Sequence, residues 1–489
     1  MATVVDDDLL SRVPPSLTVL VVALIGAAGV GFVVHLDWRL GAALIAAVLG
    51  GIAVVRSPRL AAVCLGLVPS LSGLRRGFPV PGLKLSELLG VGVAAVLICS
   101  VPKWRVRSWD ALDWVALVWV ASNIVLGGWD VAVAHHARLD TDTVSTLVAP
   151  LQFLLIFRGL RIALGWVPVR RTVLLVILLA SVPMAVAAVL QRLNVPGVRN
   201  ALVSLTGTDP FLTPGYTAVA RASGLFTIWH LLAGYELAVL FLAVTLLLTP
   251  ESDVLGSWGL CMVIGWAVVG LILSLTATCI LGAIVGVVLI GWRAGRLKLI
   301  LRWALPVGVV ACLAFFPLIN ARIQEQTVRS AGSARSSIVP QTLSYRARIW
   351  QEQYFPVIVH NVGTGWGPTL PSSITWKYSE SVYLTLLLRG GLPLLTVYGA
   401  LCWTMASRCR RLRGDPDVDA AAITTWALVV VLVPMQVLFP YFVTAGLPHL
   451  LWVFAAIAVS PITPEDRARA RATGPESGAV GLLEPVAVG

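Results

Sequence analysis

Apolar stretches of close to 20 residues recur along the chain from Ser16 to Pro461, and short polar connections separate them. About 20 apolar residues are needed for a helix to cross the roughly 30 Å hydrocarbon core of a bilayer. The pattern predicts fourteen membrane spans, at residues 16–34, 40–55, 59–74, 84–101, 111–127, 143–160, 172–191, 225–248, 258–274, 277–293, 299–318, 381–404, 421–439 and 446–460. We therefore expect an all-α, polytopic membrane helix bundle with about 12–14 transmembrane helices.

The composition agrees with this pattern. Of the 489 residues, 58% are apolar and 12% are charged, and the mean hydropathy is +0.88. A soluble domain would carry about 25% charged residues. We predict a single transmembrane domain over residues 1–462. The segment 463–489 is rich in Ala, Gly, Pro and Glu and has no helical periodicity, which predicts a disordered cytoplasmic tail.

Arginine and lysine gather in alternate connections between the predicted spans, and this indicates the orientation because positively charged short loops stay cytoplasmic. The groups on one side are Arg56 and Arg59; Lys103, Arg105 and Arg107; Arg158, Arg161, Arg170 and Arg171; Arg293, Arg296 and Lys298; Arg408, Arg410, Arg411 and Arg413; and Arg467, Arg469 and Arg471. Arg75, Arg76 and Lys84 depart from the alternation. The chain is thus predicted to be a multi-pass protein of the cytoplasmic (inner) membrane with both termini cytoplasmic.

Two long polar loops, near residues 192–224 and 319–380, then lie on the external side, and we expect the larger one to carry short helices. Long connections in compact proteins usually carry function. The net charge of +12 follows from this topology and from the attraction of basic connections to anionic lipid. Nucleic acid is therefore not expected as a partner.

The sequence predicts neither a metal nor another cofactor. The seven cysteines lie in or next to predicted spans, without a disulfide framework or zinc-ligand spacing. His135, His136, Asp140 and Asp142 are residue types that bind metals, but Arg138 interrupts them and nothing in the sequence fixes their geometry.

Three charged residues of the external side suit chemistry on a lipid-linked diphosphate. Arg221 and Arg346 each carry a planar guanidinium that fits phosphate oxygens, and two arginines can neutralise a diphosphate leaving group without a metal. Glu380, at the mouth of the twelfth predicted span, can accept a proton from a hydroxyl nucleophile as general base. The alternatives are that Arg221 anchors a helix end at the lipid headgroups, that Arg346 is only a solvated loop charge, and that Glu380 only pairs with Arg389 or Lys377.

Five further residues are predicted to contact the substrate, namely Arg348, His360, His230, Trp366 and Tyr383. Trp366 offers a flat face on which a sugar ring can pack, and the glycines around it allow close backbone approach to a ligand. His230 lies inside a predicted span, where ionisable groups are costly and usually functional. The alternatives are a structural hydrogen bond for His230 and a role of His360 in orienting the loop.

Three stretches of sequence carry a family resemblance. The first is Arg221-Ala222-Ser223-Gly224-Leu225-Phe226; the second is Arg346 and Trp350 followed by His360-Asn361-Val362-Gly363-Thr364-Gly365; the third is Tyr383-Leu384 with Leu386-Leu387 and Gly390-Gly391-Leu392. Over residues 221–404 the chain resembles the O-antigen ligase and polysaccharide polymerase family of bacterial membrane glycosyltransferases.

The resemblance implies transfer of a glycan from a polyprenyl diphosphate carrier to a sugar hydroxyl at the external face of the membrane, without a metal. The implied partners are the polyprenyl-diphosphate-linked glycan, membrane lipids and a chain-length regulator or other envelope-glycan proteins. Glu380-Ser381 stands where the family's ligases carry His-Asn, which favours a polymerase. Trp229-His230 replaces a Pro-Asn pair, and Thr276-Ala277 replaces a Ser-Arg pair.

Other functions remain as alternatives. A ligase would move the finished glycan to another acceptor. A flippase or exporter of lipid-linked glycan would have polar residues through many spans and often internal repeats, and the sequence has neither. A transferase that uses a polyprenyl monophosphate sugar commonly has an acidic pair in its first external loop, whereas residues 35–39 hold one acid, Asp37. A purely structural membrane protein would not need the long external loop.

Overall fold

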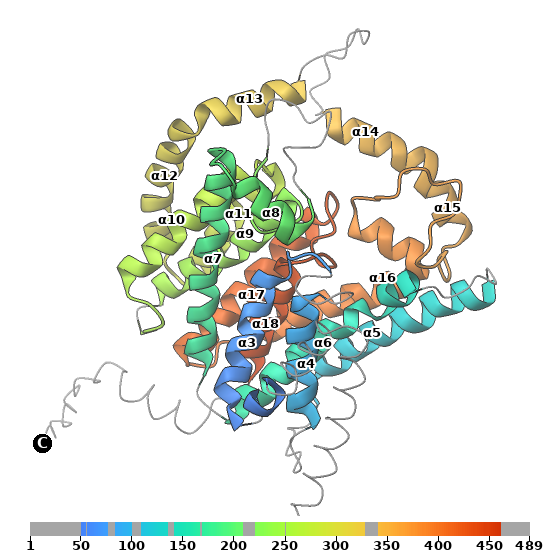
Figure 1. Cartoon of the computed structure of the whole chain (residues 1–489), viewed down its shortest axis with the longest axis horizontal. Coiled ribbons are helices and arrows are strands. Elements are labelled where there is room, and N and C mark those ends of the chain that lie inside the picture. The colour runs from blue at the N-terminus through green and yellow to red at the C-terminus, as the bar shows by residue number, and fades with distance from the viewer. Residues whose placement is uncertain are drawn as a thin grey trace, which may run out of the picture.

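The computed structural model describes residues 50–54, 56–76, 84–99, 109–134, 141–166, 169–208, 221–249, 251–327 and 341–460. Within these ranges the chain is built from helices and the turns that join them, and no strand is present. Figure 1 shows a bundle of long helices with shorter helices beyond one of its ends.

Twelve of the fourteen predicted spans coincide with helices. They are α3 (Pro58–Leu71), α4 (Leu85–Cys99), α5 (Ala111–Trp129), α6 (Thr141–Trp166), α7 (Arg170–Arg192), α9 (Trp229–Leu248), α10 (Ser257–Leu273), α11 (Ala277–Arg293), α12 (Leu297–Ala314), α16 (Val382–Cys409), α17 (Pro416–Met435) and α18 (Leu447–Val459). The first predicted span and most of the second lie outside the described residues, as does the predicted tail.

The lengths of these helices support a membrane location. In the described part of the chain, six helices are long and apolar enough to cross a bilayer, and five shorter apolar helices accompany them. The predicted all-α, polytopic membrane bundle is thus confirmed.

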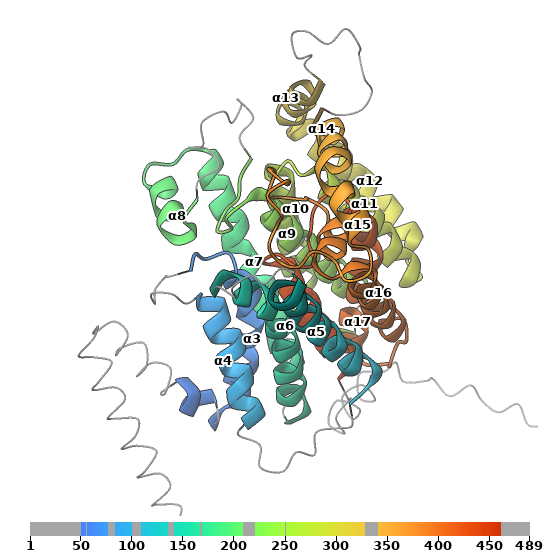
Figure 2. The same ribbon diagram turned by 90° about the vertical axis from the view of Figure 1, so that its right-hand side faces the viewer.

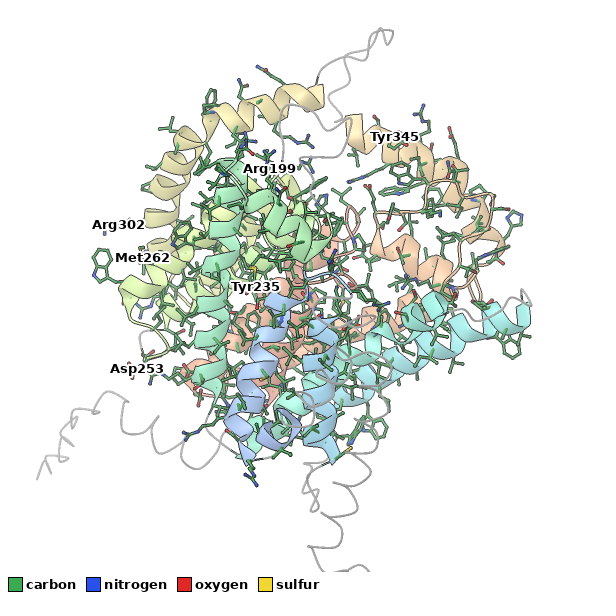
Figure 3. All side chains as sticks on the ribbon, viewed as in Figure 1. Arg199, Tyr235, Asp253, Met262, Arg302 and Tyr345 are labelled. Atoms are coloured by element: carbon green, nitrogen blue, oxygen red, sulfur yellow. The ribbon has the colours of Figure 1, made fainter. Side chains whose placement is uncertain are left out.

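The centre of the bundle is formed by α9 and α18. Every residue of α18 is buried, and α9 is buried from Leu231 onward except at Leu247. Helix α9 packs against α7, α10, α11 and α17, while α18 packs against α3, α6 and α17. Figure 3 marks Tyr235 of α9 in the middle of the molecule. A helix that is apolar on all sides is expected inside a bundle, so these two helices are the scaffold around which the polar end is arranged.

Short helices occupy the two loops that the sequence predicts to be external. They are α8 (Val198–Thr206), α13 (Phe316–Thr327), α14 (Gln341–Ile349), the π-helix η2 (Trp350–Tyr354) and α15 (Phe355–His360). Helix α13 follows α12 almost directly, and in Figures 1 and 2 both α13 and α14 stand beyond the end of the bundle. The described part of the larger loop therefore carries short helices, as predicted.

Helix α16 is broken at Gly390 and Gly391, where the backbone leaves helical geometry and Gly391 has φ +63°. The break receives the glycine-rich loop after α15. Leu388 O accepts from Trp366 N at 2.5 Å and from Gly367 N at 2.9 Å. A Cβ on Gly391 would lie 2.4 Å from the carbonyl oxygen of Val362, so only glycine fits. The close backbone approach that the loop glycines allow is thus to α16 and holds the loop over this helix.

Candidate active site

An ion pair joins two of the three predicted catalytic residues. Arg346 lies near the end of α14 and Glu380 lies two residues before α16, and Nε of Arg346 pairs with Oε2 of Glu380. The two side chains are 20% and 27% exposed, so both remain accessible to solvent. Because Nε faces the carboxylate, the guanidinium keeps its two Nη groups, which carry four further N–H donors.

Glu380 is held in a backbone conformation that L-residues rarely adopt, with φ +54°. Such a conformation costs about 1–3 kcal/mol and persists only where the surroundings impose it. Here Trp350 Nε1 donates to Ser379 O at 2.7 Å on one side, and Val382 N donates to Gln436 O at 3.0 Å on the other. The backbone on both sides of Glu380 is therefore held by hydrogen bonds, and this fixes the position of the carboxylate.

The π-helix η2 holds the irregular segment that leads to Glu380. The amide oxygen of Gln353 accepts from the backbone N–H groups of Thr375 and Trp376, both at 3.1 Å. Tyr354 donates its hydroxyl to Trp376 O at 2.6 Å. Burial, with a contribution from the Glu380 carboxylate, raises the pKa of Tyr354 to about 12, so the hydroxyl remains a donor at neutral pH.

The third predicted catalytic residue, Arg221, is positioned by a different part of the bundle. The side-chain oxygen of Gln191, on α7, accepts from Ser223 N at 2.9 Å and from Gly224 N at 3.0 Å, and Ala222 N donates to Leu273 O at 3.0 Å. The guanidinium of Arg221 lies over the ring of Trp229, 4.9 Å from its centroid. Arg221 is thus held beside the first residue of α9.

His230 lies near Arg221, through their shared neighbour Trp229, and near Arg346. It follows Trp229 at the start of α9 and stacks on Phe439, with ring centroids 4.3 Å apart. Among the described residues its buried Nδ1 has no hydrogen-bond partner. Arg346 lies close enough for its charge to act on both His230 and Tyr441. The structure therefore gathers the three predicted catalytic residues and His230 at one end of the bundle.

Three helix N-termini meet at this end of the bundle. Helix α9 begins beside Arg221, α16 begins beside Glu380, and the first turn of α11 contacts Tyr441 through Thr278, whose hydroxyl lies 3.2 Å from that of Tyr441. None of the three has a hydrogen bond from an N-cap side chain. Helix N-termini carry partial positive charge and favour anions, so they add to the field of the arginines.

The other four predicted binding residues have different surroundings. Arg348 is exposed and lies 5.8 Å from the ring centroid of Tyr345, and His360 is exposed with Nδ1 2.6 Å from Pro356 O. Trp366 packs on the small apolar cluster around Tyr354. Tyr383 donates to Val433 O. In these positions Trp366 and Tyr383 support the fold of the loop and of α16, whereas Arg348 and His360 lie at its surface.

Sequence reasoning missed two residues of the site. Gln436 accepts from Val382 N through its backbone oxygen and from Tyr398 through its side chain at 2.8 Å. Tyr441 belongs to the connection between α17 and α18. That connection is short, and the only signal was a polar residue and an aromatic residue at the end of an apolar span.

The described residues contain no group of three metal-binding side chains, and His135, His136 and Asp140 lie outside them. The site instead combines arginines, one carboxylate and helix N-termini at one end of a polytopic helical bundle. This arrangement places a group of positive charges beside a carboxylate in a multi-pass membrane protein, and such charges suit an anionic ligand.

A family model matches part of the chain. Residues 261–399 match the family model described as O-antigen ligase, a segment that includes Arg346 and Glu380 and ends in α16. No curated protein matches the chain. The match covers the second and third of the three motifs and supports the family resemblance, and it supports glycan transfer of the ligase or polymerase type.

Proposed function

We propose that this protein is a glycan polymerase that transfers an oligosaccharide from a polyprenyl diphosphate carrier to a sugar hydroxyl at the external face of the cytoplasmic membrane. The observation that carries the proposal is the pair formed by Arg346 and Glu380 from two separate elements. Arg221 lies at the same end of the bundle, linked to the pair through Trp229 and His230.

Each group has a role in the proposed reaction. Glu380 accepts the proton of the acceptor hydroxyl while that oxygen attacks the anomeric carbon of the donor sugar. The bond between this carbon and the diphosphate oxygen breaks, and the carrier diphosphate leaves with the electron pair. Arg221 and Arg346, with the N-termini of α9, α11 and α16, stabilise the negative charge of the leaving group.

The geometry couples the two halves of this reaction. Arg346 uses Nε to hold the carboxylate of Glu380, and its Nη groups would then bind the phosphate. One guanidinium would thus fix the distance between base and leaving group. Because the charge is balanced by arginines and helix N-termini, the proposed mechanism needs no metal.

The second candidate is ligation of a finished glycan to another acceptor. It is favoured by the description of the matching family as O-antigen ligase. Polymerisation is preferred because Glu380-Ser381 occupies the position of the His-Asn pair of the ligases that the motif resembles. Both candidates use the same donor and the same arginines.

The test is the profile of lipid-linked and polymeric glycans in cells that lack the protein and are complemented with wild type, Arg346→Ala, Glu380→Gln or Glu352→Gln. Glu352 is an exposed glutamate of η2 and is the matched control. We expect Arg346→Ala and Glu380→Gln to lower elongation by about 10²–10⁴-fold at unchanged abundance in the membrane, because each removes a group that acts on the reacting bonds. Glu352→Gln should behave as wild type.

The accumulating product distinguishes the two candidates. Single repeat units on the carrier indicate a polymerase. Full-length polymer that stays on the carrier indicates a ligase. An unchanged profile in the deletion strain would exclude glycan transfer altogether, and loss of both activity and abundance in the variants would mean that the Arg346–Glu380 pair is structural.

A further inference from the structure

The end of the bundle opposite to Glu380 contains a cavity of about 620 Å³. Its lining residues are Trp292 and Arg293 at the end of α11, Arg410 directly after α16, and Trp426 on α17. Helix α16 begins beside Glu380 and ends at Cys409, so the cavity is separated from the proposed active site by the whole length of that helix. It lies at the end predicted to be cytoplasmic.

The cavity is basic and lacks a neutralising carboxylate. The guanidinium of Arg293 donates to the backbone oxygen of Arg410, and in the described part of the chain neither arginine forms an ion pair with an acid. Other arginines at this end do have such partners, since Arg170 pairs with Asp415 at 3.3 Å and Arg171 with Asp253 at 3.6 Å. Two adjacent arginines without a counter-charge favour a phosphate ligand.

Two tryptophans flank these arginines. The rings of Trp292 and Trp426 have centroids 6.3 Å apart, and Trp292 is 61% exposed. Tryptophan is typical of the membrane interface, where its ring lies at the level of the lipid headgroups. The aromatic pair therefore indicates that the two arginines lie at headgroup depth.

Exposed apolar side chains lead away from the cavity along α11 and α17. On α11 they are Leu281, Ile284, Val285 and Val288, and on α17 they are Val430 and Val433. These residues follow helical spacing, so each set forms a stripe on one side of its helix, and α11 packs against α17. The two stripes start at Trp292 and Trp426 and offer a surface for acyl chains directly beneath the arginines.

We propose that this cavity binds an anionic glycerophospholipid, with the headgroup phosphate between Arg293 and Arg410 and the acyl chains along α11 and α17. The site is independent of the glycan-transfer reaction. It would tie the ends of α11 and α16 to anionic lipid of the leaflet on that side of the membrane.

The test uses the full-length protein in detergent, incubated with phosphatidylglycerol or phosphatidylcholine, and counts retained lipids by native mass spectrometry. Wild type should retain phosphatidylglycerol in preference to phosphatidylcholine. Arg293→Gln/Arg410→Gln should lower this retention by about 10- to 30-fold, because each basic residue near an anionic headgroup contributes about one kcal/mol. Arg296→Gln/Arg408→Gln changes two exposed arginines outside the cavity and is the control with the same net charge.

Three results would overturn the proposal. One is equal retention of the two lipids by wild type, which needs no variant and is therefore independent of folding. Another is an equal loss in the control double variant, which would indicate a diffuse charge effect. The third is displacement of phosphatidylglycerol by millimolar inorganic phosphate, which would identify a site for free phosphate instead of a lipid.

Discussion

The two ends of the bundle hold arginine–carboxylate clusters of opposite character. At one end, Asp113 of α5 is completely buried between Arg158, at 2.8 Å, and Arg161, both on α6. At the other end, Arg346 and Glu380 form a single pair that remains partly exposed, and the carboxylate stands on strained backbone. Figure 3 marks Asp253 and Tyr345, which lie at these two opposite ends.

In the first cluster both arginines pair with the buried carboxylate of Asp113. Arg161 also pairs with Asp110 at 3.3 Å, and Asp110 and Asp113 cap the first turn of α5 through a reciprocal capping box. In the second cluster a guanidinium keeps donors unused and faces a carboxylate that is held in place at a cost in backbone energy. The difference agrees with a stabilising role of these residue types at one end and with the proposed chemical role at the other.

The largest expected effect comes from exchanging the two charges of the active-site pair. Arg346→Glu/Glu380→Arg keeps an ion pair between the same positions, so membrane abundance should recover compared with either single exchange. Glycan elongation should stay about 10²–10⁴-fold below wild type, because the base and the phosphate ligand no longer face the reacting groups. Quantitative immunoblotting and the lipid-linked glycan profile measure the two outcomes. Restored elongation would assign the pair a structural role only.

Disruption of the buried cluster is expected to lower the amount of folded protein. Asp113→Ala leaves Arg158 and Arg161 buried without their shared partner, which should cost about 3–5 kcal/mol and remove most folded protein from the membrane. Asp253→Ala is the matched control, since its side chain is 78% exposed and its pair with Arg171 should contribute about 0–1 kcal/mol. Thermal aggregation in detergent compares the two variants. Equal stability would show that burial of the cluster does not matter.

A smaller effect should follow from a methyl group at the break of α16. Gly391→Ala places a Cβ 2.4 Å from Val362 O on a residue with φ +63°, so the loop must move or the backbone must strain by about 1–3 kcal/mol. We expect faster proteolysis in the glycine-rich loop and reduced elongation. Gly399→Ala on the same helix meets nothing within 4 Å and should leave both unchanged. Unaltered proteolysis of Gly391→Ala would contradict the docking of the loop on α16.

The smallest effect is expected at the hydroxyl of Tyr354. Tyr354→Phe removes the hydrogen bond to Trp376 O and should weaken the segment before Glu380 by about 1 kcal/mol. In wild type the raised pKa makes this contribution complete below pH about 10, the usual tyrosine value, and lost as the pH rises through about 12. In wild type, residues 375–380 should lose protection from hydrogen exchange as the pH rises through the raised pKa of Tyr354. Tyr354→Phe should not show this pH-dependent loss.

The membrane spans could be predicted from the sequence because hydrophobic length belongs to contiguous residues. The span predicted at 172–191 is α7, Arg170–Arg192, and the break between 274 and 277 was placed to within a residue or two of the ends of α10 and α11. Arg221, Arg346 and Glu380 could be proposed as site residues from the sequence, since charged residues stand out in a chain with few of them.

The pairing of these residues could not be predicted. Lys377 and Arg389 are closer to Glu380 in the sequence than Arg346 is, and only the fold of η2 against residues 375–376 decides among the three. The contact of the glycine-rich loop with α16 was also not predicted. Glycines allow the backbone to approach another group closely, but they do not indicate whether that group is a ligand or another helix. Both outcomes depend on contacts between segments that are distant in the sequence.

Under the proposed function, the break in α16 also bears on the depth of the site in the bilayer. The helix beyond Gly391 has about 18 residues and is roughly 27 Å long, which is close to the thickness of the hydrocarbon core. Val382–Arg389, before the break, then lies at the level of the headgroups, and so does the carboxylate of Glu380. A carrier lipid whose tail stays in the membrane would present its diphosphate at this depth, so the proposed reaction would not require the lipid to be lifted out of its leaflet.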